Sequence, residues 1–333
     1  MKLSDIARLA GVSVTTASYV INGKAVQRRI SAATVARVCA VVAQHDFQPD
    51  PQAAGLRSGQ TRTLGFILPD LENPSYARLA KRLEQGARAR GYQLLIASSD
   101  DQPQTERQLL QLFRARRCDA LIVASCLPAE DDSYRRLLDG GLPVIGVDRV
   151  LDPAHFCSVI SDDHEASRQL TASLLHPAPR QIALLGARPE LSISQARSAG
   201  FRQALSGSAS EALLEQGEAF SRACGRHLME ALLERLGQLP DALITTAYVL
   251  LEGVFDVLKA HDLLRDPAPL ALGTFGDAQL LDFLPLTVNS MVQQHGLIAE
   301  QVLQRALDAV EQGLYQAGVH AVARTFQQRR TEP

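Results

Sequence analysis

The hydrophobic positions of the first 45 residues recur at the spacing of short amphipathic helices. Ile6, Leu9 and Ala10 form one apolar stripe, and Gly11 permits the positive φ that ends a helix. We expect Ser4 to cap this helix by accepting backbone N–H groups of its first turn. The pattern predicts a helix of about two turns, followed by a tight turn.

Two further helices are predicted on the same grounds. The second spans 14–21 behind the cap Ser13, and the third runs from the cap Ser31 to about His45. Two short helices joined by a tight turn form a helix-turn-helix, whose second helix enters the major groove of DNA. The alternative for these residues alone is a small amphipathic helical hairpin.

From Thr63 onward, short apolar runs alternate with helical patterns. Such alternation is typical of parallel sheets covered by helices on both faces, and it is too long for one doubly wound sheet. We therefore expect two similar α/β subdomains with a ligand cleft outside the carboxyl ends of the strands. The expected strands are Leu64–Leu68, Leu94–Ser98, Ala120–Ala124, Val144–Val147, Val159–Ser161, Ile182–Leu185, Ala242–Thr245 and Leu270–Thr274. The expected helices lie near 75–90, 103–116, 131–140, 163–175, 193–205, 221–236, 248–261 and 295–313.

We predict that residues 49–62 form a connector between these two parts. Pro49 and Pro51 interrupt the chain, and residues 52–59 have room for one or two helical turns, which alone are marginal in water. A plain flexible linker is the alternative, but it does not account for the large apolar Leu56 among Gly, Ser and Arg residues.

The two ends of the chain also differ in net charge. The 333 residues carry a net charge of −2, yet residues 1–62 hold eight Lys and Arg against three Asp, a net +5, and the remainder is −7. A basic block on an acidic body suits a DNA-reading head on a body that does not itself bind DNA.

Composition points to a cytoplasmic protein. The five Cys form no Cys-x-x-Cys pair and read as reduced thiols. No apolar segment reaches transmembrane length, and Asp5 interrupts any signal peptide, so we expect neither a membrane partner nor a periplasmic location.

Six short sequences carry a resemblance to a known family. They are DIARLAGVS at 5–13, TASYVINGK at 16–24, AAGLR at 53–57, PDLEN at 69–73, GYQLLIA at 91–97 and FGD at 275–277. These sequences resemble the lac-repressor family of sugar-responsive transcription regulators, over almost the whole chain.

The resemblance implies three parts. They are an all-α helix-turn-helix head at 1–48, a hinge helix or linker at 49–62, and a periplasmic-binding-protein-like effector domain with parallel doubly wound sheets at 63–333. The two α/β subdomains of that domain would comprise about 63–161 plus 293–322, and 162–292 plus the C-terminal end. A homodimer or homotetramer would bind a pseudopalindromic operator in double-stranded DNA.

The head and hinge provide the expected DNA contacts. Bases would be contacted by Val14, Thr15, Thr16 and Tyr19, the DNA backbone by Ser4, Ser13 and Asn22, and phosphates by a clamp of Lys24, Arg28 and Arg29. By resemblance, Leu56 matches a hinge leucine that enters the minor groove, and Arg57 beside it suits a phosphate. Val14 stands where the resemblance leads us to expect a basic residue, so the operator preference stays open.

Polar side chains near strand ends are the candidate effector ligands. They are Ser75, Tyr76, Asp148, Arg149, Arg197, Asp277 and Gln294. By resemblance, Asp148 and Asp277 match acceptors for sugar hydroxyls, and the arginines and Gln294 match donors. Guanidinium groups suit phosphate. The resemblance indicates fructose 1-phosphate as effector, with fructose 1,6-bisphosphate as the weaker candidate and another sugar as the alternative. A competing interpretation is that Asp148, Arg149 and Asp277 form ion pairs between subdomains.

An enzyme acting on a sugar phosphate is the main rival class. The chain has no Gly-x-Gly-x-x-Gly after a strand, no glycine loop of the Walker type and no His-Glu-x-x-His. The acidic run at 162–165 suits a first helical turn better than a metal site, and Ser125–Cys126 has no evident base. A module that only binds proteins does not explain the head. We therefore predict a DNA-binding regulator, mainly a repressor, of sugar and central carbon metabolism, with no cofactor and no metal.

Overall fold

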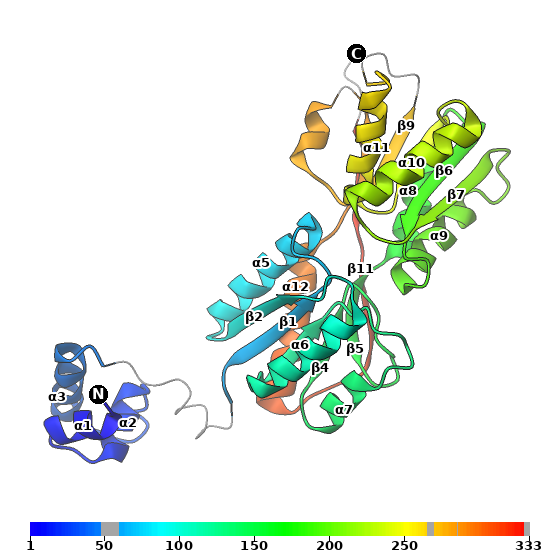
Figure 1. Ribbon diagram of the computed structural model, residues 1–333. Helices are drawn as coiled ribbons and strands as arrows, with labels where there is room; N and C mark the ends of the chain where they lie inside the picture. The colour runs from blue at the N-terminus through cyan, green and yellow to red at the C-terminus, as the bar shows by residue number, and fades with distance from the viewer. Residues whose placement is uncertain (48–59, 265–269, 285, 330–333) are drawn as a thin grey trace. The chain divides into compact units, whose positions relative to one another are not determined.

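The computed structural model describes residues 1–47, 60–264, 270–284 and 286–329, and it separates into two compact units, Met1–Arg62 and Thr63–Pro333 (Figure 1). The helical turns expected at 52–59, with Leu56 and Arg57, lie outside the described residues. Within the described ranges, no helix combines the length and the apolar character that crossing a membrane requires.

The first unit is built from three helices around a small apolar core. These are α1 (Leu3–Leu9), α2 (Val14–Ile21) and α3 (Ala32–Gln44). Ile6, Ala17 and Val38 provide one fully buried side chain from each helix. The three helices thus close on one another, as the predicted helix-turn-helix requires.

Two of the three predicted caps are confirmed. Ser13 Oγ accepts the backbone N–H three residues further on at 3.1 Å, and Ser31 Oγ does the same at 3.3 Å. The cap predicted at Ser4 is wrong, because α1 begins at Leu3, two residues earlier than that cap requires. Asp5 Oδ2 instead accepts the backbone N–H of Lys2 at 2.9 Å, so the carboxylate stabilises the start of α1.

The second unit contains two six-stranded sheets, each with helices on both faces, which we call the first and second lobe (Figure 1). The sheet of the first lobe is parallel throughout, in the order β11-β5-β4-β3-β1-β2. Its strands are β1 (Thr63–Leu68), β2 (Gln93–Ser98), β3 (Ala120–Val123), β4 (Val144–Val147), β5 (Cys157–Ser161) and β11 (Gly318–Val322). One face of this sheet is covered by α5 (Pro74–Ala89) and α12 (His295–Leu307), and the π-helical turn Asp308–Gln312 continues α12. The other face is covered by α6 (Pro103–Ala115) and α7 (Ser133–Asp139).

The second lobe has the order β12-β10-β9-β8-β6-β7. Its strands are β6 (Gln181–Ala187), β7 (Glu211–Gly217), β8 (Ala242–Thr245), β9 (Ala271–Phe275), β10 (Val288–Val292) and β12 (Thr325–Gln327). One face carries α8 (Asp163–Ala172) and α9 (Ser192–Ala204), the other α10 (Arg222–Leu236), α11 (Tyr248–Ala260) and the 3-10 turn η1 (Gln279–Phe283). Strand β12 runs antiparallel to β10, whereas the other described pairs of this sheet are parallel.

The chain passes between the two lobes three times, after β5, after β10 and after β11. The three crossings are bonded to one another. The N–H of Asp162 donates to the carbonyl of Val322 at 3.0 Å, and Gln293 Nε2 donates to Ser161 Oγ at 3.1 Å. The lobes are therefore joined by one hydrogen-bonded strap rather than by three independent linkers.

Candidate functional site

The outer side of α2 carries the side chains expected to read DNA bases. Val14, Thr15 and Asn22 are exposed, and Thr16 and Tyr19 are partly buried. Val14 leaves 44% of its surface exposed at the start of the helix. A helix with one apolar buried side and an accessible, mainly polar side has the shape that enters a major groove.

The turn after α2 supplies exposed positive charge. Lys24, Arg28 and Arg29 are all exposed, and the Arg28 guanidinium lies 4.9 Å from the ring centre of Tyr19. A cation held over an aromatic ring is partly ordered in advance, which suits a phosphate contact.

Ser13 and Asn22 have local roles as well. The side chains of Ser4 and Ser13 are exposed. The amide of Asn22 donates to the carbonyl of Ser18 at 2.8 Å, so it closes the last turn of α2.

A cavity lies between the lobes, lined by residues that follow the carboxyl ends of their strands. Six of the seven residues expected to bind an effector are part of its wall: Ser75, Tyr76, Asp148, Arg149, Arg197 and Asp277. Gln294 is not. Strand β10 ends at Val292, so Gln293 takes the wall position, and Gln294 Nε2 donates to Thr325 Oγ1 instead.

Asp148 is an ionised acceptor in this wall. Tyr76 OH donates to its Oδ2 at 2.7 Å, and Gln293 Nε2 donates to its Oδ1 at 2.9 Å. Burial alone would raise the pKa of Asp148, but the charges of Arg197 and Arg324 and these two hydrogen bonds hold that pKa below its usual value. The carboxylate keeps lone pairs for a further hydroxyl donor.

Two arginines share one carboxylate on the opposite side of the cavity. Arg197 and Arg324 each place Nη2 near the same oxygen of Asp163, at 2.9 and 3.0 Å. Both guanidinium groups also lie over the ring of Phe275, at 4.5 and 5.3 Å from its centre. The charge of Asp148 also acts on both guanidinium groups, so these two buried cations lie near two carboxylates and bond directly to Asp163.

Two of the expected ligands form ion pairs, but each within one lobe and not between the subdomains as the competing interpretation expected. Arg149 forms a bidentate pair with Asp101 of its own lobe, at 2.6 and 3.1 Å. Asp277 accepts from Arg329 Nη2 at 2.7 Å. Asp148 lies in neither pair.

Ser75 and His295 form a neutral part of the wall. Ser75 Oγ donates to Gln293 Oε1 at 2.7 Å and lies 3.0 Å from His295 Nε2. Burial lowers the pKa of His295 to about 4, and the charges of Arg324 and Arg78 add to that effect. His295 is therefore uncharged near neutral pH.

Thr246 and Arg324 are among the wall residues that sequence reasoning missed. Thr246 follows β8 directly and is 1% exposed, and its Oγ1 has no hydrogen-bond partner among the described residues. The rule that selected Asp148 would have selected it too. Arg324 follows β11, a strand that the sequence does not predict, so no signal marked it.

The residues that suggested an enzyme have structural roles. Burial, with a smaller contribution from Glu106, raises the pKa of the Cys126 thiol to about 12, so this thiol is not a nucleophile. Ser125 Oγ donates to Glu106 at 2.6 Å. In the acidic run, Glu165 pairs with Arg168. Across the described ranges, no group of three or more His, Cys, Asp or Glu could hold a metal ion.

Two family models match the chain. Bacterial regulatory proteins, lacI family, match residues 2–50, and the periplasmic binding proteins and sugar binding domain of the LacI family match residues 61–303. The fructose operon regulatory protein of Vibrio cholerae is 48% identical over 99% of this chain and 100% of its own length. The catabolite repressor/activator of Escherichia coli K12 is 45% identical over 94% of this chain and 93% of its own length.

Solved structures of transcription regulators also resemble this chain. The Cra transcriptional dual regulator from Pseudomonas putida, crystallised with fructose 1-phosphate, is 71% identical, with a TM-score of 0.78 over 81% of this chain and 99% of that one. The lac repressor dimer bound to operator has a TM-score of 0.83 over 99% of this chain and 98% of that one, at 20% identity, and is a likeness of fold alone. These relatives are regulators and not enzymes, and the chain belongs to the lacI family of bacterial regulatory proteins.

Proposed function

We propose that this DNA-binding transcriptional regulator releases its operator when fructose 1-phosphate enters the cavity between the lobes. Repression is its main action, on genes of sugar and central carbon metabolism. The similarity to the fructose operon regulatory protein and to the catabolite repressor/activator supports this assignment. The 71% identical regulator crystallised with fructose 1-phosphate supports the choice of effector.

The observation that carries the proposal is the shared carboxylate of Asp163. The buried guanidinium groups of Arg197 and Arg324 both pair with this one carboxylate, and the charge of Asp148 also acts on them. Guanidinium groups bind phosphate oxygens in pairs, and sharing one carboxylate oxygen leaves further N–H donors of both arginines for an anion. We assign the phosphate of the effector to these two arginines.

The sugar hydroxyls are assigned to the facing groups. Asp148 accepts from one hydroxyl, and the unpartnered Oγ1 of Thr246 bonds another. A buried hydroxyl without a partner is unfavourable, and a ligand that supplies the partner recovers that free energy. Ser75, Tyr76, Arg149 and Asp277 then shape the wall, and Gln293 replaces Gln294 in the proposed ligand set.

DNA release follows from a population shift. We divide the chain into a head at 1–48, a connector at 49–62 and an effector domain at 63–333. In the DNA-bound dimer or tetramer, the connectors pair and Leu56 and Arg57 contact the operator. Effector binding favours closed lobes, in which the connectors separate and operator affinity falls. Coupling of about 1–3 kcal/mol per site is the usual range. A protein that binds chromosomal DNA in a bacterium works in the cytoplasm.

The test is operator release. Fluorescence anisotropy of a labelled pseudopalindromic operator with the full chain should report release by micromolar fructose 1-phosphate, and little release by fructose 1,6-bisphosphate at the same concentration. If neither sugar releases the DNA, the chain still binds DNA, but fructose 1-phosphate is not its effector. Release by the bisphosphate alone would reassign the effector within the same site.

A further inference from the structure

Asp101 is a carboxylate outside the cavity wall that holds a wall residue in place. It follows β2 with a φ of 53°, in the left-handed region that non-glycine residues seldom adopt. Both of its oxygens accept from Arg149, at 2.6 and 3.1 Å. A bidentate arginine–carboxylate pair fixes the plane of the guanidinium as well as its position.

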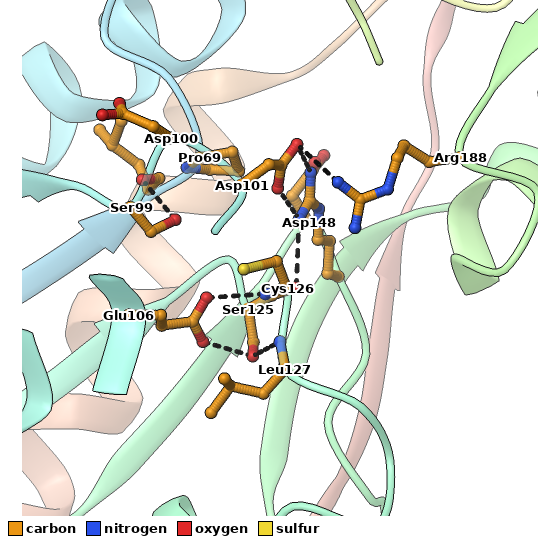
Figure 2. Close-up of polar contacts among 12 residues, drawn as sticks. Pro69, Ser99, Asp100, Asp101, Glu106, Ser125, Cys126, Leu127, Asp148 and Arg188 are labelled. Carbon is orange, nitrogen blue, oxygen red and sulfur yellow. Dashed lines mark hydrogen bonds and ion pairs between the residues drawn. The ribbon is translucent and has the colours of Figure 1, made fainter. Parts of the chain in front are cut away.

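The same carboxylate also faces the second lobe. Arg188 comes directly after β6, and its Nη1 lies 3.7 Å from Asp101 Oδ2. Figure 2 shows Arg188 extending from its own lobe toward Asp101. The side chains of Arg188 and Asp101 are 18% and 22% exposed, so water screens this pair less than it screens surface pairs. Arg188 also pairs more closely, through Nε, with Glu190 of its own loop. Asp101 is thus approached by one arginine from each lobe, and it is the more distant of the two carboxylates of Arg188.

Arg149 is held from a second side by a buried network. Its Nη1 donates to the carbonyl of Ser125 at 3.2 Å. The loop that carries this carbonyl is fixed by Glu106, which is fully buried and accepts from Ser125 Oγ at 2.6 Å and from the N–H of Cys126 at 2.8 Å (Figure 2). Arg149 is therefore held between Asp101 and the carbonyl of Ser125.

The pair between Asp101 and Arg188 exists only while the lobes are close. Rotation of either lobe lengthens the distance of 3.7 Å and exposes both charges to water, whereas the bidentate pair lies within one lobe and is unaffected. A contact that is present in one arrangement of the lobes and absent in the other biases the equilibrium between them.

We propose that Asp101 is a positioning residue of the effector response, which seats Arg149 in the cavity wall and ties the lobes together through Arg188. This inference rests on the proposed release of the operator by fructose 1-phosphate. By linkage, a contact that favours the closed lobes raises effector affinity and lowers operator affinity.

The test compares Arg188→Gln with Arg222→Gln in the full chain, by calorimetric titration of fructose 1-phosphate. Arg222 pairs with Asp256 within the second lobe, outside the cavity wall, and is the matched control. Arg188→Gln should weaken effector binding by about 3- to 10-fold, which is the range of a partly screened ion pair. Arg188→Lys should restore most of the affinity, and Arg222→Gln should match the wild type.

Asp101→Asn should have a larger effect, about 30-fold, because it also leaves Arg149 buried without a carboxylate. Adding Arg188→Gln to Asp101→Asn should weaken binding no further, since the contact is already lost. Additive losses would overturn the proposal, as would equal affinities of Arg188→Gln and Arg222→Gln. In all these variants, operator affinity without effector should stay equal to wild type or increase.

Hydrogen exchange of the effector-free protein separates this inference from the proposed effector. Arg188→Gln should speed amide exchange at 98–102 in the first lobe about threefold or more, and Arg222→Gln should not. Unchanged exchange at 98–102 would overturn the tie between the lobes. If wild-type protein does not bind fructose 1-phosphate, the proposed effector fails, and the exchange rates still decide the role of Asp101.

Discussion

The two sides of the effector cavity use the same residue types for opposite purposes. On the side of the first lobe, Arg149 is neutralised by Asp101, and Asp148 stays ionised with capacity to accept. On the other side, Arg197 and Arg324 share a single carboxylate. The side of the first lobe therefore suits hydroxyl donors and the other suits an anion. The N–H donors that an arginine has left unused, rather than the presence of an arginine, decide where phosphate can bind.

The largest effect is expected from removing one of the two arginines that share Asp163. Arg324→Ala leaves Asp163 balanced by Arg197 alone, so we expect affinity for fructose 1-phosphate to fall about 100-fold, as for a lost charged hydrogen-bond donor of about 3 kcal/mol. Isothermal titration measures it. Arg324→Lys keeps the charge and should lose less. Wild-type affinity in Arg324→Ala would place the phosphate elsewhere in the cavity.

The two carboxylates of the wall, Asp148 and Asp277, can be compared by the same substitution. Asp148→Asn should weaken effector binding about 10-fold, because an amide presents one acceptor where the carboxylate presents two. Asp277→Asn should change it less than about threefold, since Asp277 is already engaged by Arg329. The same titrations compare the two variants. A larger loss in Asp277→Asn would reverse the assignment of the hydroxyl acceptor.

Thr246→Val separates ligand binding from stability. The substitution removes a buried hydroxyl that has no partner and keeps the shape of the side chain, so the free energy of unfolding should stay equal or rise by about 0.5–1 kcal/mol. Effector affinity should nevertheless fall about fivefold. Denaturant unfolding without effector and titration with it give the two values. A fall in both would mean that Thr246 has only a packing role.

The smallest expected effect concerns His295. Its pKa of about 4 in the folded protein lies below the ordinary value of 6.5, so the unfolded chain binds a proton that the folded chain refuses. The free energy of unfolding should fall as pH drops through this window, by about 1 kcal/mol between about pH 7.5 and pH 5.5. His295→Asn should show that much less pH dependence than wild type. Equal slopes would show that folding does not lower the pKa of His295.

Local signals predicted most of the fold. The caps Ser13 and Ser31 are read from a few neighbouring residues, and the apolar runs of the central strands are buried along nearly their whole length. The sequence does not predict β7, β10, β11 and β12. Strands β7 and β11 are edge strands with mixed, partly exposed residues, and β10 contains Asn289 and Ser290, so none presents a continuous apolar run.

The site was less predictable because its electrostatics depend on contacts between distant segments. Position after a strand was enough to find Asp148 and Asp277. It could not reveal that Asp101 balances Arg149, or that Asp163 is divided between two arginines. Strand β10 ends at Val292, so Gln293 and not Gln294 lines the cavity. Such boundaries are the least certain part of a prediction from sequence.

The strap of three crossings determines which cavity contacts persist when the cleft opens. In a rotation about the strap, atoms move in proportion to their distance from it. Gln293 and Arg324 lie on the strap and move least, whereas Arg188 reaches across from a separate loop and moves away. A sugar phosphate docked first on the pivot residues can stay in place while the outer contacts form. Contacts to the pivot residues therefore tolerate lobe movement, whereas the contact made by Arg188 depends on it.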